Sequence, residues 1–185
     1  GLTTAAQQEV LEAARFAIGW ESRDGALALQ AAENLEKLKP GSAEGMRARV
    51  LAYEVTGRWQ DAEQASRTWV AQRPGDAGAK QALVRALNGQ GRYADALELL
   101  APEVRAGTAD AAQLNNYAWQ ALRAGTVDDF AVKAAENSSA QRQRRDYSSS
   151  HTLACLYADQ GRVGEARRVL LQLLDDQPMV DPLDG

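Results

Sequence analysis

The sequence is poor in cysteine, histidine, aromatic residues and proline. It has one cysteine and one histidine, and aromatic residues make up 6% of its 185 residues. A single cysteine, Cys155, excludes an internal disulfide framework. With so few rings, a core must rely on alanine and leucine, and such cores are usually helix packed on helix. Five prolines leave the helices with few internal breakers.

Long hydrophobic runs and a basic charge excess are also missing. No run of 18 apolar residues occurs, so no helix is expected to span a bilayer. The net charge of −4 and the pI of about 5.1 provide no basic surface for counterion release, which argues against nucleic acid as a partner. One cysteine fits a reducing compartment and slightly favours the cytoplasm.

Other features of composition concern the origin of the chain. It begins at Gly1 and ends at Asp184-Gly185, so we interpret it as part of a longer polypeptide. Arginine heavily outnumbers lysine and alanine is abundant, which is typical of a bacterial source with a GC-rich genome.

What the sequence does contain is an internal repeat. Four glycine-led segments are spaced 34, 34 and 36 residues apart. The prolines follow the same period, because Pro40 and Pro74 are 34 residues apart and Pro178 follows after three periods plus two residues. Two independent markers therefore report the same register and the same two-residue insertion. The segments are Gly57–Ala62, Gly91–Ala96, Gly125–Phe130 and Gly161–Ala166.

Each position of the repeated segment has a physical reason. The glycine suits a left-handed residue at the end of a helix. Two residues later an apolar side chain can fill the bend between two helices, and the alanine is small where the helices cross. The later proline stops the second helix. The apolar residues are Trp59, Tyr93, Val127 and Val163, and the alanines are Ala62, Ala96 and Ala166.

Between these markers the apolar residues recur with helical spacing. Leu83, Val84 and Leu87 occupy positions i, i+1 and i+4, which is one face of a helix. The pattern predicts about ten helices, at roughly 3–18, 25–38, 43–56, 60–72, 77–89, 94–105, 110–124, 128–140, 147–160 and 164–176.

This 34-residue helix-turn-helix period, with small residues in the hairpin and a closing proline, resembles the tetratricopeptide repeat. The resemblance covers roughly residues 43–178 and implies an all-α fold, a right-handed α-solenoid of helical hairpins with an inner groove. We expect a single array over 1–185, with a degenerate unit at 3–40 in which Arg23 stands at the bend. The other units are expected at 43–74, 77–108, 110–142 and 147–178, followed by a tail at 179–185.

Several residues depart from the family pattern. Arg49 stands where a large apolar residue is usual, and Phe130 stands where alanine is usual. Thr108 and Arg142 replace the closing proline, and Pro102 lies inside a second helix that it should kink or shorten. No capping helix follows Pro178, so Leu171 and Leu174 are expected to form an exposed apolar strip that favours a homodimer.

The resemblance also implies a binding surface, because the first helix of each hairpin lines the inner groove in this family. Asparagine and glutamine can bind peptide backbone, arginine can bind carboxylate, and tryptophan offers a stacking surface. The alternative is that these are solvated residues that serve solubility. The expected groove residues are Glu44, Arg47, Leu51, Glu54, Gln81, Arg85, Asn88, Asn115, Asn116, Trp119, Arg123, His151, Cys155 and Asp159.

More specific sites find little support. His151 and Cys155 are four residues apart and could form a nucleophile pair or half a zinc site, but no second His or Cys completes it. The segment from Ser138 to Ser150, with Arg142, Arg144 and Arg145, could contact anions or be phosphorylated; we interpret it as the lengthened connection between repeats. No phosphate loop or nucleophile elbow is present, so we expect neither an enzyme nor a cofactor.

The leading hypothesis is therefore a scaffold that binds a peptide or a partner domain in its inner groove. One alternative is the non-catalytic repeat region of a larger bacterial enzyme, because the segment His151–Gly161 is similar to late repeats of such proteins. Another is a homo-oligomerisation module that uses the uncapped end.

Overall fold

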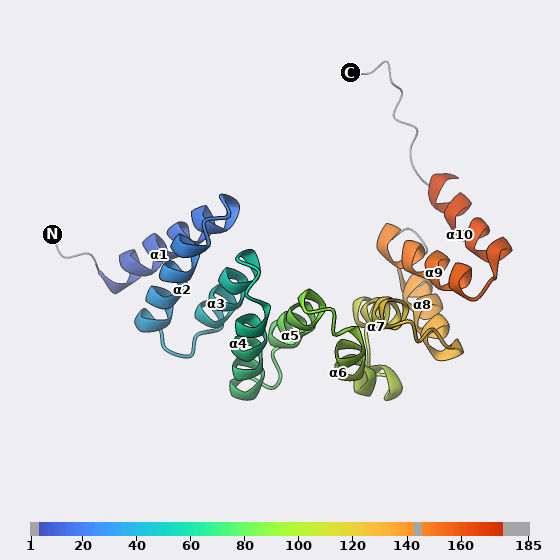
Figure 1. Cartoon of the computed structure of the whole chain (residues 1–185), viewed down its shortest axis with the longest axis horizontal. Helices are drawn as coiled ribbons and strands as arrows, with labels where there is room; N and C mark the ends of the chain where they lie inside the picture. The colour runs from blue at the N-terminus through green and yellow to red at the C-terminus, as the bar shows by residue number, and fades with distance from the viewer. Residues whose placement is uncertain (1–3, 143–145, 176–185) are drawn as a thin grey trace, which may run out of the picture. The chain divides into compact units, whose positions relative to one another are not determined.

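The computed structural model describes residues 4–142 and 146–175, and all regular structure in these residues is helical. The predicted all-α fold with ten helices is confirmed, and every helix begins and ends within three residues of its expected bounds (Figure 1). The helices are α1 Ala5–Glu21, α2 Gly25–Leu38, α3 Ala43–Val55, α4 Trp59–Gln72, α5 Ala77–Gly89, α6 Tyr93–Arg105, α7 Ala111–Ala124, α8 Asp129–Gln141, α9 Tyr147–Asp159 and α10 Val163–Asp175.

The odd-numbered helices α1, α3, α5, α7 and α9 begin with the same local chemistry. A short polar side chain precedes each of them and accepts a hydrogen bond from a backbone N–H of the first turn, which satisfies a group that the helix leaves unpaired. These N-cap residues are Thr4, Ser42, Asp76, Asp110 and Asp146. The repeat therefore marks helix starts as well as helix ends.

The bends that follow these helices all use a left-handed residue. Gly57, Gly91, Gly125 and Gly161 have φ between 68° and 74°, as the spacing of the glycines predicts. In the first, degenerate hairpin Arg23 takes this place with a φ of 58°. A side chain in this region is strained, and Arg23 is the residue that the 34-residue register puts there.

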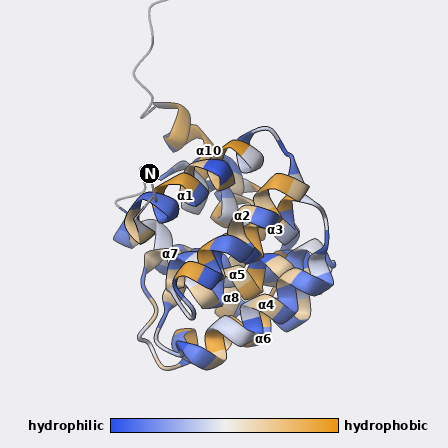
Figure 2. Cartoon of the chain, turned by 90° about the vertical axis from the view of Figure 1, so that its left-hand side faces the viewer, coloured by the Kyte–Doolittle hydropathy of each residue, from blue (hydrophilic) through white to orange (hydrophobic). Residues whose placement is uncertain are grey.

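The chain divides into two compact units, of which unit 1 is residues 1–92. In it, successive helices from α1 to α5 pack on one another, and α3 also contacts α1 and α5. Each helix carries both hydrophilic and hydrophobic residues (Figure 2). The core contains Val50 and Trp69 beside fully buried alanines, whose small side chains let helices approach closely. These alanines are Ala28, Ala32, Ala62, Ala79, Ala82 and Ala86.

Unit 2 is residues 93–185, described here as 93–142 and 146–175. Successive helices from α6 to α10 pack on one another, and α7 also packs on α9. Leu114, Tyr117, Leu153 and Leu156 are buried in its core. The prediction of a single array with the stated repeat boundaries stays a prediction.

Local structure accommodates the departures from the repeat pattern. Phe130, at a position where alanine is usual, is 41% exposed and meets the ring of Tyr117 edge-on, with the centroids 5.6 Å apart. Arg49 is half-buried and lines a shallow hollow of about 240 Å³ together with Met46 and Tyr53. Each large or polar side chain thus lies at the surface of the helix pair and not inside it.

Two more departures lie near helix ends. Pro102 does not shorten α6, which continues through it to Arg105 and is as long as α8 and α10. Arg142 forms the C-cap of α8 and pairs with Asp146, with Nη1 and Oδ1 3.1 Å apart. Arg144 and Arg145 lie outside the described residues.

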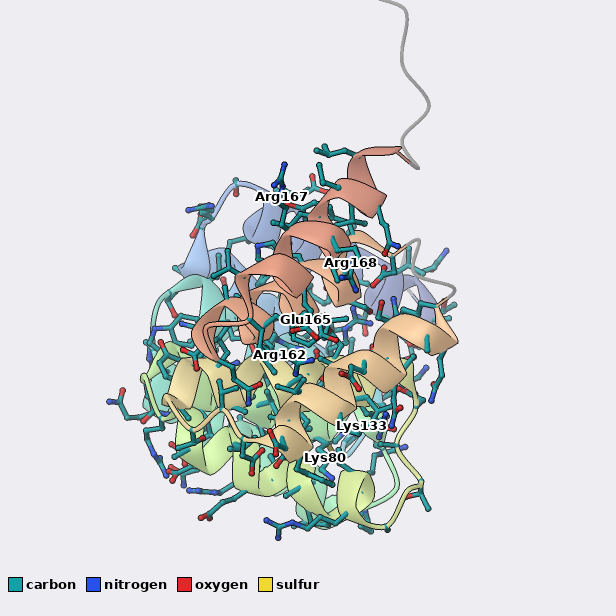
Figure 3. All side chains as sticks on the ribbon, turned by 90° about the vertical axis from the view of Figure 1, so that its right-hand side faces the viewer. Lys80, Lys133, Arg162, Glu165, Arg167 and Arg168 are labelled. Carbon is teal, nitrogen blue, oxygen red and sulfur yellow. The ribbon has the colours of Figure 1, made fainter. Side chains whose placement is uncertain are left out.

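Helix α10 carries the expected apolar strip. Leu170, Leu171 and Leu174 are 43%, 46% and 69% exposed. At the start of the same helix Arg162 and Glu165 lie side by side as an ion pair with a separation of 2.5 Å (Figure 3). The exposed leucines are found where the sequence predicts them, and self-association through them stays a prediction. Pro178 and the tail at 179–185 lie outside the described residues.

Within residues 4–142 and 146–175, none of the helices is long and apolar enough to cross a membrane.

Candidate functional site

The helices α1, α3 and α5 of unit 1 form a surface with two adjoining hollows, here called the first-helix face. The α1–α3 hollow has a volume of about 340 Å³ and the α3–α5 hollow one of about 460 Å³. They share Glu44, Arg47 and Leu51 of α3, so the two hollows adjoin at that helix. The first is also lined by Ala13, Phe16, Ala17, Trp20, Glu21, Leu35 and Ala48, and the second by Ala43, Trp69, Asp76, Gly78 and Arg85.

The repeat register explains why the α1–α3 hollow exists. Ala13 and Ala17 stand 34 residues before Arg47 and Leu51, so α1 presents small side chains where α3 presents large ones. Trp20 stands beside the space that they leave, 38% exposed, and its ring stacks on Phe16 at 6.4 Å between centroids. An alanine floor between an indole and a leucine is an apolar recess.

Two of the predicted groove residues form an ion pair on this face. Arg85 Nε donates to both carboxylate oxygens of Glu54, at 3.1 and 3.2 Å, and so ties α5 to α3. The Glu54 side chain is 9% exposed and that of Arg85 45%. Burial raises the pKa of Glu54 above its ordinary value, because the loss of hydration outweighs the hydrogen bond and the charge of Arg85.

The other charges of the two hollows are arranged differently. Glu21, Glu44 and Arg47 are exposed, and none of them has an ion pair or hydrogen bond with another residue of the described chain; Glu44 interacts at longer range with Lys39, which is itself paired with Glu9. Asp76 is occupied: it accepts a hydrogen bond from Trp69 Nε1 at 3.0 Å and one from the Gly78 N–H at 2.9 Å. Three side chains therefore remain available to a partner.

The other two groove residues predicted on α5 are less accessible than Arg85. Gln81 and Asn88 are half-buried, and Gln81 has an interaction within the protein. The Oδ1 atom of Asn88 is buried without a hydrogen-bond partner in the described residues.

In unit 2 the predicted residues of α7 and α9 form a row of rings. The ring of His151 lies 6.1 Å from that of Trp119 and stacks on Tyr147 at 5.7 Å, and Tyr147 is 65% exposed. Asn115 Nδ2 donates to Ser148 Oγ at 3.3 Å beside this row. Tyr147 is absent from the predicted set, although its position one helical turn before His151 indicates a shared face.

Three predicted residues of unit 2 lie outside the row of rings. Arg123 is held on Tyr93, with its guanidinium 4.1 Å from the ring centroid and Nη2 donating to the hydroxyl at 2.5 Å. Asn116 is half-buried and has an interaction within the protein, and Asp159 is exposed. The predicted set in unit 2 is thus only partly clustered.

The histidine and the cysteine do meet, with Cys155 Sγ 3.8 Å from His151 Nε2. Burial raises the pKa of the Cys155 thiol, which disfavours the thiolate that a nucleophile or a metal ligand requires. Within the described residues, His, Cys, Asp and Glu side chains form no group of three that could hold a metal ion. The geometry gives the pair no chemical activation.

The serines at the end of α8 and the start of α9 are structural. Ser138 and Ser149 are buried, and their hydroxyl oxygens are 3.1 Å apart. Ser149 donates through its N–H and its hydroxyl to Asp146, at 2.8 and 2.7 Å, and these bonds together lower the pKa of Asp146. Burial of Ser138, Ser149 and Ser150 disfavours phosphorylation there and supports a role as a connection between repeats.

A further hollow of about 360 Å³ lies among α8, α9 and α10 and is polar. Tyr157 donates to Glu136 at 3.0 Å within it, and Lys133 pairs with Glu136 at 3.2 Å. Its charged side chains, Glu136, Glu165, Lys133 and Arg168, balance one another. This hollow offers no charge or apolar preference, so the first-helix face of unit 1 is the stronger candidate.

Sequence reasoning missed the contribution of α1 to that face. Phe16, Trp20, Ala13 and Ala17 line the α1–α3 hollow, but the segment 3–40 is expected only as a degenerate unit. Subtracting 34 from Arg47 and Leu51 points to Ala13 and Ala17, so the signal was present in the register. That a recess results depends on packing.

Helical hairpins at a 34-residue spacing, each closed by a left-handed residue, define an α-helical repeat protein. Residues 20–77 match the family model of the tetratricopeptide repeat. Over these residues the chain is similar in sequence to the tetratricopeptide repeat.

Solved structures with the same fold are known. MamA from Desulfovibrio magneticus RS-1, from its residue 41 to its end, is 14% identical, with a TM-score of 0.73 over 91% of this chain and 94% of that one. TTC0263, described as a thermophilic TPR protein of Thermus thermophilus, is 21% identical, with a TM-score of 0.66 over 96% and 93% of the two chains. No curated protein matches the sequence. At these identities the likeness concerns the fold.

The family-model match at residues 20–77 indicates a general role. Tetratricopeptide-repeat proteins are protein–protein interaction scaffolds and are typically non-catalytic, and this chain has the repeat and the fold of that class. A partner protein is therefore the general expectation. Its identity and the residues that bind it are matters for proposal.

Proposed function

We propose that the chain is a scaffold module whose first-helix face in unit 1 binds an extended or helical segment of a partner protein. The observation that carries the proposal is the pair of adjoining hollows that share Glu44, Arg47 and Leu51. Four of the residues that the sequence predicts for the groove line these hollows, and Glu54 is paired with one of them, Arg85. The four are Glu44, Arg47, Leu51 and Arg85.

The energetic argument rests on exposed apolar surface. Trp20 is 38% exposed at the rim of a recess with an alanine floor, where a side chain of a partner would be removed from water on several sides. Burial of a leucine or phenylalanine side chain contributes about 1.5–3 kcal/mol. One such anchor next to a tryptophan is the usual core of a peptide interface.

Filling the recess from the protein side tests the proposal. Ala17 is exposed and lines the α1–α3 hollow, so Ala17→Leu should occupy the anchor site without disturbing the core. A library of random twelve-residue peptides displayed on phage would be selected against the chain, and selected peptides measured by fluorescence anisotropy. We expect Ala17→Leu to weaken binding of these peptides at least tenfold.

Ala14→Leu is the matched control, since Ala14 is exposed on the same helix and does not line the hollow. It should leave the affinity unchanged. Selected peptides that bind the Ala17→Leu chain as well as the unaltered chain would rule out this face as the binding site.

The row of rings formed by Trp119, His151 and Tyr147 favours a second contact surface on unit 2. If a longer partner also contacts this surface, Trp119→Ala should weaken binding of that partner. The affinity of the short peptides that bind unit 1 should not change. Equal loss for both kinds of ligand would contradict two separate surfaces.

A second candidate function is self-association through α10, favoured by the exposure of Leu171 and Leu174. Light scattering over a hundredfold dilution would show a mass that falls toward the monomer. The double change Leu171→Glu and Leu174→Glu should abolish the concentration dependence. A monomeric mass at every concentration would remove this candidate.

A further inference from the structure

We infer that the segment bound by the first-helix face of unit 1 is basic and apolar: a large apolar side chain enters the α1–α3 hollow, and a lysine or arginine next to it meets Glu21 and Glu44. The inference rests on the proposed function, because it names the chemistry of the partner at the same face. It follows from the charges that line the two hollows.

The acidic side chains outnumber the free basic ones. Carboxylates of Glu21, Glu44 and Asp76 line the hollows, against the guanidinium groups of Arg47 and Arg85. Arg85 is already neutralised, because its Nε is 3.1 Å from Glu54. Three carboxylates thus face one guanidinium whose charge is not compensated, and a cationic partner is favoured.

The positions of these groups divide the recess into an apolar part and a charged rim. Ala13, Ala17 and Leu51 supply apolar surface, while Glu21 directly follows Trp20 in α1. A lysine or arginine can lay its aliphatic stem on the indole and place its charge beside the carboxylate of Glu21. An acidic side chain in the same place would meet Glu21 and Glu44 and would be repelled.

Substitution of Arg47 tests the inference, because it should change the affinity in the direction opposite to substitution of Glu21 or Glu44. Arg47 lines both hollows, is exposed, and has no ion-pair or hydrogen-bond partner in the described part of the chain. Its charge repels a basic segment, whereas those of Glu21 and Glu44 attract it. Removing Arg47 should therefore strengthen the binding that removing either glutamate weakens.

The probes are three synthetic twelve-residue peptides with a central pair of leucines in an alanine–glutamine background. They differ only in their flanking residues, which are lysine, glutamine or glutamate. Dye-labelled peptides are titrated with the full chain at about 50 mM and 300 mM salt. We expect the lysine peptide to bind tightest and the glutamate peptide weakest, with a difference that shrinks at the higher salt concentration.

The variants Glu21→Gln and Glu44→Gln should each weaken the lysine peptide roughly two- to fivefold, the range measured for exposed ion pairs. Arg47→Gln should strengthen binding of the lysine peptide by a similar factor, and all three changes should affect binding of the glutamine peptide less than binding of the lysine peptide. All three residues are exposed, so thermal unfolding should be the same as for the unaltered chain.

The outcomes separate the two proposals. Preference for the glutamate peptide, or charge variants without effect, would overturn the basic–apolar inference, while sensitivity to Ala17→Leu would keep the binding face. If none of the peptides binds, or if Ala17→Leu has no effect on those that do, both the face and the inference are wrong.

Discussion

Arg85 Nε lies 3.1 Å from Glu54 Oε1, and this ion pair joins α5 to α3 across 31 positions of sequence. Another buried carboxylate of the same unit, Glu63 of α4, accepts hydrogen bonds from Gln90 and Arg92 at 2.7 and 2.8 Å. The pKa values of the two glutamates are shifted in opposite directions. Burial wins at Glu54 and raises its pKa, whereas Glu63 has enough partners to overcome burial, and its pKa is lowered.

Glu54→Gln should leave the protein at least as stable at neutral pH, within about 1 kcal/mol. With a raised pKa, folded Glu54 binds a proton more readily than unfolded Glu54, so its contribution to stability falls as the pH rises above 4.5. The variant should lack this decline. Urea unfolding between pH 4 and 7 measures it, and a variant that loses several kcal/mol at pH 7 would contradict the prediction.

Glu63→Gln should have the opposite signature. A carboxyl whose pKa is lowered contributes stability above its unfolded pKa of about 4.5 and loses it as the pH falls through the folded value. Its side chain is 7% exposed and pairs with Arg92 and Arg67, which are themselves 41% and 59% exposed. We expect a loss of about 1–2 kcal/mol at pH 7 that disappears in acid. A loss that does not depend on pH would disprove the role of the charge.

Arg23→Gly should stabilise the chain by about 1 kcal/mol, because Arg23 has a φ of 58° that glycine adopts without strain. The matched change is Gly57→Ala at the equivalent bend, where φ is 69° and an added Cβ meets no heavy atom within 4 Å. Gly57→Ala should therefore destabilise the chain by a similar amount, and only because of its left-handed backbone conformation. Urea midpoints of both variants provide the measurement. Destabilisation by Arg23→Gly would mean that contacts of the arginine side chain outweigh the strain.

Gly89→Ala should destabilise the chain by about 1–3 kcal/mol through overpacking. A Cβ at Gly89 would lie 2.1 Å from Cδ2 of Trp59, the residue that begins α4. In a Trp59→Leu background the clash is removed, and the same change should become neutral or gain up to about 1 kcal/mol from helix propensity. A double-mutant cycle measures the coupling. Additive effects would show that the glycine is not required by the indole.

The helix pattern could be predicted closely because it depends on local chemistry. The bend glycines, the closing prolines and the polar side chains at helix starts each act within a few residues of their own position. Arg23 shows the strength of this register, since it adopts a left-handed φ although it is not glycine. The groove residues of α3 and α5 follow from the same register, because each first helix turns the same positions to the same face.

The sequence by itself therefore determined that this chain is a helical repeat protein and where its helices begin and end. Only the tertiary structure decided that Ala13 and Ala17 leave a recess beside Trp20. It also decided that Arg85 pairs with Glu54, whereas Arg47 has no ion-pair partner among the described residues, and that Glu63 is buried with partners. Helix formation is set by neighbours along the chain, whereas recesses and charge pairs join residues about 30 positions apart whose distances arise only when the helices pack.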